Sequence, residues 1–75
     1  MKRISYKRLW VQLIEKDLSK SEMKKALRLS AGTMSKLSKG EDVSLSVLLR
    51  ICDYLNCDIG EICEAVSVNI PQAIG

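Results

Sequence analysis

Side chains that could bind an anionic partner are concentrated in one half of the chain. Residues 1–40 contain eleven Lys or Arg and three acidic residues, a net charge of +8, whereas residues 41–75 contain one Arg and six acidic residues, a net charge of −5. This asymmetry predicts a basic face that contacts a polyanion. Ordinary solvated charge is the alternative, because basic surface residues also keep proteins soluble.

Three cysteines are the residues that could hold a metal ion or take part in redox chemistry. Cys52, Cys57 and Cys63 lack the C-x-x-C spacing of a zinc site, and the chain contains no His. Their number is odd and the first residues show no export signal, so we expect reduced thiols in the cytoplasm. A redox switch stays an alternative, because it depends on thiol pKa and access. We predict no metal and no cofactor.

Catalysis and membrane insertion have little support. The sequence has no His, no G-x-G-x-x-G or P-loop motif and no recognisable activated nucleophile, so we expect no enzyme and no small-molecule ligand. It also has no apolar run of eighteen residues that could span a bilayer. A length of 75 residues predicts a single domain, and an aromatic content of 4% predicts an aliphatic core.

Two short helices are predicted in the second part of the basic half. The first covers residues 20–27 and begins with Ser19 and Glu22, which fit an S-x-x-E capping box. Ser30 can cap the second, which covers residues 31–39. Each helix therefore has its own start signal.

The connection between these helices determines how they pack. Only Arg28, Leu29 and Ser30 separate them, which is too short for antiparallel stacking, so the helices should cross steeply in a helix-turn-helix. Gly40 is a suitable stop after the second helix. Met34 and Leu37 would then face inward and leave a small, hydroxylated and basic surface outside.

The amino-terminal region is predicted to hold a first helix that Ser5 caps and that ends near Lys16. Its apolar stripe would comprise Tyr6, Leu9, Trp10, Leu13 and Ile14. Lys2 and Arg3 precede this helix, and they form either a flexible basic tail or an arm that reaches a polyanion.

Two more helices are predicted in the acidic half, which completes an all-α, compact five-helix bundle. Ser44 can cap the fourth helix, and Asp58 with Glu61 can start the fifth. The inward residues would be Leu45, Leu48, Leu49, Cys52 and Leu55 in the fourth helix, and Ile59, Ile62, Cys63 and Val66 in the fifth. Residues 67–75 would form a loose tail, or a β-prone segment around Pro71 that pairs across a dimer.

The central segment resembles the phage-repressor-like (Cro/repressor, XRE) helix-turn-helix family, particularly its short stand-alone bacterial members. The resemblance covers about residues 5–66 and implies a lambda-repressor-like DNA-binding fold with residues 1–75 as one domain. It is carried by Ser19, Glu22, Met23, Ser30, Thr33, Met34, Ser35, Lys36, Leu37 and Gly40, followed by residues 43–62.

The resemblance also implies which residues contact DNA. The base-contacting positions of the family align with Ala31, Gly32, Thr33 and Lys36. Lys36 can donate to guanine, Thr33 can meet a base edge or a thymine methyl group, and Ala31 offers only apolar contact. Gly32 either lets DNA approach closely or is a tolerated first-turn glycine.

Contacts to backbone phosphates are implied for Lys20, at the start of its helix, and for Ser35 and Lys39. Two positions depart from the pattern of the family. Lys24 stands where many relatives have Ala, and Arg28 stands where many have Gly or Asn. An Arg in the left-handed conformation would cost on the order of 1 kcal/mol.

Together these features predict sequence-specific binding to double-stranded DNA by a small bacterial or phage transcriptional regulator that represses by occupancy. A homodimer on a palindrome would increase affinity and specificity. The alternative is a protein-interaction module, such as an antitoxin-like regulatory partner, on which the basic face is incidental.

Overall fold

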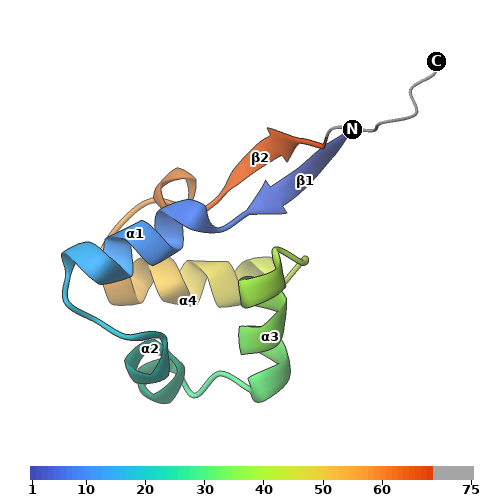
Figure 1. The fold of residues 1–75 in the computed structure, drawn as a ribbon. Coiled ribbons are helices and arrows are strands. Elements are labelled where there is room, and N and C mark those ends of the chain that lie inside the picture. The colour runs from blue at the N-terminus through green and yellow to red at the C-terminus, as the bar shows by residue number, and fades with distance from the viewer. Residues whose placement is uncertain (69–75) are drawn as a thin grey trace.

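The computed structural model describes residues 1–68. It contains four α-helices, a short 3-10 helix and a two-stranded sheet (Figure 1). In chain order these are β1 (Lys2–Ser5), α1 (Lys7–Glu15), α2 (Lys20–Leu27), α3 (Ala31–Lys39), α4 (Leu45–Leu55), η1 (Ile59–Glu61) and β2 (Glu64–Ser67). The helices gather on one side, and the sheet projects from them (Figure 1). None of the helices within residues 1–68 has the length and apolar character needed to cross a membrane.

Serine hydroxyl groups cap the amino-terminal ends of α2, α3 and α4. The Ser19 hydroxyl accepts from the backbone N–H of Glu22 at 3.0 Å, and the Glu22 carboxylate accepts from the Ser19 N–H at 3.0 Å. The hydroxyls of Ser30 and Ser44 cap α3 and α4 by accepting from the backbone N–H groups of Thr33 and Val47. These bonds satisfy amide groups that a helix leaves unpaired in its first turn. The predicted bounds of the second and third helices are confirmed.

The prediction for the amino-terminal residues is wrong in one respect. Residues 2–5 form a β-strand, so they are neither a flexible tail nor part of a capped helix. Tyr6 precedes α1 and makes no side-chain capping bond, while the Ser5 hydroxyl accepts from the Lys7 N–H at only 3.4 Å. The strand forms because β2 offers it backbone hydrogen bonds, a partner that local sequence patterns do not reveal.

The predicted fifth helix is also wrong. Asp58 and Glu61 do form the expected capping box, but the helix stops after the single turn of η1. Residues 64–67 then pair antiparallel with β1, with Ser5 opposite Glu64 and Lys2 opposite Ser67. The all-α expectation is therefore corrected to a mostly helical fold with a small sheet. The β-prone segment proposed around Pro71 lies outside the described residues.

The core is aliphatic, as predicted, but two helices present different faces to it than expected. In α1, Leu13 is 2% exposed while Ile14 is 76% exposed. In α4, Ile51 is fully buried, whereas Leu45 and Leu49 are 60% and 54% exposed. Helical spacing restricts the apolar residues to a broad stripe, and packing against neighbouring helices determines which part of that stripe is covered. The remaining core residues include Leu9, Met23, Leu29, Leu37, Leu48, Cys52, Leu55 and Ile62.

Tyr6 links α1 to the loop that follows α3. Its ring is buried, and its hydroxyl donates to the backbone carbonyl of Glu41 at 2.8 Å. Burial raises the pKa of Tyr6 above its ordinary value of 10.0. The folded state therefore favours the neutral hydroxyl, and this contribution to stability is lost as pH rises through the raised pKa.

The variant Tyr6→Phe tests this contact. At pH 7 we expect its free energy of unfolding to be lower by about 0.5–1.5 kcal/mol, because a hydrogen bond is removed. Between about pH 9 and 11 the parent should lose more stability than the variant, since only the parent has this buried hydroxyl to ionise. Urea denaturation at each pH measures both effects. Parallel pH profiles for the two proteins would contradict the assignment.

Candidate nucleic-acid interface

A tight turn sets the angle between α2 and α3. Arg28 adopts the left-handed conformation, with φ 54° and ψ 44°, and its N–H bonds to carbonyls of the last turn of α2. Leu29 is buried beneath the turn. In Figure 1, α2 is seen nearly end-on while α3 runs across the view, so the two axes are far from parallel. This confirms the steep crossing and the left-handed conformation expected for Arg28.

Two contacts hold this helix pair against the rest of the molecule. Met23 of α2 and Leu37 of α3 are almost completely buried in the shared core. The Arg50 guanidinium of α4 donates to the carbonyl of Leu27, at the end of α2. Arg50 is the one basic residue of the acidic half, and its guanidinium connects α4 to the end of α2.

The solvent-facing side of α3 carries most of the residues that the sequence assigns to DNA. Ala31, Gly32, Ser35, Lys36 and Lys39 are all exposed. Ala31, Gly32 and Ser35 have small side chains that project little from the helix, and the flexible ammonium groups of Lys36 and Lys39 extend beyond them. The helix can therefore approach a partner closely along its length.

Thr33 differs from the other assigned residues of α3 because it is partly buried. Its backbone N–H donates to the Ser30 hydroxyl at 3.0 Å, and its own hydroxyl oxygen accepts from the same Ser30 group at 3.0 Å. Thr33 can still donate its hydroxyl proton. It thus takes part in the cap and keeps one hydroxyl proton for an external acceptor.

Gly32 has no packing partner that requires a glycine. A Cβ atom placed there would meet only the Ser30 hydroxyl oxygen, at an ordinary 3.8 Å. The free protein should therefore gain up to about 1 kcal/mol of stability in Gly32→Ala, since Ala is the better helix former. If DNA approaches this point of α3, the same variant should bind a duplex more weakly.

Thermal unfolding and duplex titration of Gly32→Ala separate these two effects. Gly60→Ala is a suitable control, because it adds the same methyl group in η1, away from α3, where a Cβ atom would meet nothing within 4 Å. A more stable Gly32→Ala variant that binds DNA as well as the parent would show that the glycine is merely tolerated.

Lys20, the first residue of α2, lies over an aromatic ring. Its ammonium nitrogen is 4.1 Å from the centroid of the Trp10 ring in α1. A cation–π contact of this kind restricts an otherwise flexible side chain at the amino-terminal end of the helix, where anions are favoured. The sequence assigned Trp10 to the core. The structure shows it half-buried, and no periodic pattern could have revealed this pairing of residues from two helices.

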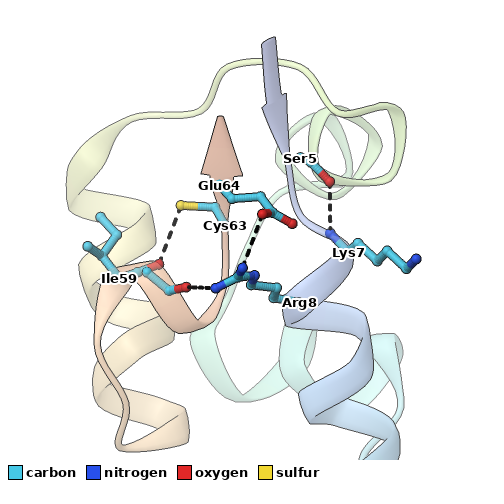
Figure 2. Close-up of polar contacts among 7 residues, drawn as sticks. Ser5, Lys7, Arg8, Ile59, Cys63 and Glu64 are labelled. Atoms are coloured by element: carbon cyan, nitrogen blue, oxygen red, sulfur yellow. Dashed lines mark hydrogen bonds and ion pairs between the residues drawn. The ribbon is translucent and has the colours of Figure 1, made fainter. Parts of the chain in front are cut away.

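Almost all basic side chains within residues 1–68 lack an acidic partner. Within residues 1–68 the only ion pair joins Arg8 of α1 to Glu64 of β2, at 3.1 Å. Arg8 also donates to the Gly60 carbonyl at 3.0 Å (Figure 2). The other ten basic residues of the amino-terminal half form no ion pair with the described residues. Their charge is available to an external anion.

All three cysteines are free thiols. Burial raises the pKa of the Cys52 and Cys63 thiols, which is opposite to the shift found in reactive cysteines. The Cys63 thiol donates to the Ile59 carbonyl at 3.5 Å (Figure 2). In the part of the chain that the structure describes, no group of three or more His, Cys, Asp or Glu residues is arranged to hold a metal ion.

Comparison with known proteins identifies the helix pair. A family model described as the Cro/C1-type HTH DNA-binding domain matches residues 8–67. The chain belongs to this family. The resemblance inferred from the sequence is thereby confirmed, and α2, the turn and α3 form the helix-turn-helix of a Cro/C1-type domain.

A solved structure of similar sequence supports the same conclusion. The crystal structure of the transcriptional regulator VanUg, form II, matches with a TM-score of 0.85 and 52% sequence identity, and the match covers 87% of each chain. A search of curated proteins gives no match. The Cro/C1-type domain described here is thus similar over most of its length to a transcriptional regulator.

Proposed function

We propose that this protein binds double-stranded DNA in a sequence-specific manner and acts as a small bacterial or phage transcriptional regulator, blocking transcription by occupying its site. In this proposal α3 enters the major groove, where Ala31, Gly32, Thr33 and Lys36 meet base edges. The observation that carries the proposal is the exposed surface of α3, whose small and basic residues lie beside cations that form no ion pair within residues 1–68.

Phosphate contacts are proposed for Lys20, Ser35 and Lys39. Such contacts position a protein on the duplex without reading its sequence. Lys20 is supported by its place at the start of α2 and by the Trp10 ring beneath its ammonium group. Ser35 and Lys39 are supported by their exposure on α3.

A homodimer on a palindromic site is part of the proposal. One module with few base contacts binds weakly, and two modules about one helical turn apart would bind together more tightly. The exposed Leu45 and Leu49 lie one turn apart on α4 and are candidates for a contact between copies. The same pair also favours the second candidate function, a protein-interaction module that docks on an unrelated partner.

Selection of bound duplexes from a random library tests the proposal. Recovery of a defined sequence supports specific binding, and recovery of a palindrome supports the dimer. An unenriched library would contradict sequence-specific recognition and favour the interaction module.

Two lysine variants then test the roles of individual residues on the selected site. Lys36→Ala should reduce discrimination between the correct and a mutated base pair by about 1–3 kcal/mol, because a donor to a base is lost. Lys20→Ala should weaken binding to all sites alike, because its proposed partner is a phosphate. Fluorescence anisotropy with matched and mutated duplexes measures both. If both variants bind as the parent does, the assignment of roles is wrong.

A further inference from the structure

The basic surface of α3 continues onto the small sheet. The C-terminal end of α3 lies towards β1, while its N-terminal end points away from the sheet (Figure 1). An open hollow between them is lined by Arg3 of β1 and by Ser38, Lys39 and Gly40, and its lining contains no acidic residue. Lys39 and Arg3 thus each contribute one positive charge to the lining of this hollow.

Gly40 permits this close approach of the strand. It ends α3 in the left-handed conformation, with φ 72°. A Cβ atom at this position would lie 3.3 Å from a terminal nitrogen of Arg3 and 3.5 Å from the Ile4 carbonyl oxygen. The Arg3 guanidinium is therefore located directly at the end of α3.

Pairing with β2 holds Arg3 in this place. Arg3 lies opposite Val66 in the antiparallel sheet, and the Val68 N–H donates to the Met1 carbonyl at 2.9 Å. A backbone that is already ordered loses less conformational entropy when it binds a partner. Arg3 is exposed and makes no hydrogen bond or ion pair with another side chain of residues 1–68.

We propose that Arg3 is a DNA-phosphate contact, and that β1, held in place by β2, extends the interface beyond the helix-turn-helix. This inference rests on the proposed function, because it requires α3 to lie in the major groove. A nine-residue helix is about 13 Å long and the groove is about 12 Å wide, so the end of α3 lies close to a sugar-phosphate chain. Arg is well suited to phosphate, which it can bind through two parallel N–H groups.

Lys2 provides a matched control. It neighbours Arg3 on the same strand and carries the same charge, but adjacent residues of a strand point to opposite faces. Its ammonium group donates to the Ser67 hydroxyl of β2 at 3.2 Å. The variants Arg3→Gln and Lys2→Gln therefore remove equal charge from two faces of one strand.

The experiment titrates the full chain and both variants with a selected 20-base-pair duplex at several salt concentrations. For Arg3→Gln we expect about tenfold weaker binding and a slope of log K against log salt that is smaller by about 0.9 for each bound protomer. Lys2→Gln should retain the slope of the parent. In ethylation interference, Arg3→Gln should no longer respond to a modified phosphate beyond the end of α3.

Equal effects of the two variants, or an unchanged slope in Arg3→Gln, would overturn the assignment of Arg3. The Arg3 guanidinium also lies near the C-terminal carbonyls of α3, so the thermal unfolding of Arg3→Gln is measured in parallel to detect a loss of stability. Arg3→Lys serves as a second variant, which keeps the charge and should keep the slope. A parent protein without steep salt dependence would instead contradict the proposed function. The two failures are therefore distinguishable.

Discussion

Raising the salt concentration from 50 to 200 mM should weaken binding to the selected duplex by about two-thousandfold. Each protomer offers three cationic phosphate contacts in our proposals, namely Lys20, Lys39 and Arg3, so a dimer would neutralise about six phosphates. Each neutralised phosphate releases condensed counterions and contributes about 0.9 to the slope of log K against log salt. The expected slope is thus about −5.4. Fluorescence anisotropy over this range of salt measures it directly.

The size of the slope also discriminates between assemblies. A single protomer with the same contacts would give a slope of about −2.7 and a loss of only about fortyfold. A slope shallower than about −1 would contradict a DNA-binding role and favour the protein-interaction module. We expect a steep slope because ten basic side chains of the first forty residues form no ion pair within the described structure.

Replacing Leu13 by Ala should lower the free energy of unfolding by about 2–4 kcal/mol, whereas Ile14→Ala should change it by about 0.5 kcal/mol or less. Both residues belong to the apolar stripe that helical spacing predicts for α1. Leu13 is 2% exposed and would leave a cavity, but Ile14 is 76% exposed and would leave none. The corresponding difference in melting temperature is about 10–25 °C for a domain of this size.

This pair of variants is matched in position, since both residues lie in the last turns of α1. Thermal unfolding followed by circular dichroism gives the measurement. Similar losses in the two variants would mean that Ile14 is covered in solution, for example by a second copy of the chain. Small changes in both would contradict the packing of α1 described here.

The helix-turn-helix was predictable because its determinants are close together in the sequence. Ser19 and Glu22 are three residues apart, and Ser30 caps the helix that follows it directly. Capping bonds of this kind satisfy the first amide groups of a helix and depend little on distant residues. The candidate residues of α3 followed from the helix bounds and from the resemblance, and their exposure agrees with the assignment.

Other parts of the site depend on contacts between elements that are distant in the sequence. The ammonium group of Lys20 lies over Trp10 of another helix, and Arg3 approaches Gly40 from a strand. No local pattern contains either contact. Both were missed for that reason, although the basic character of Lys2 and Arg3 had suggested an arm.

The sequence by itself determined the basic half, the starts and ends of α2 and α3 and the family of the domain. Only the tertiary structure decided that residues 64–67 pair with β1 instead of continuing a helix from Asp58, and that Ile51 rather than Leu49 faces the core. Local preferences differ by only about 1 kcal/mol, and burial of side chains and backbone pairing between distant segments outweigh them.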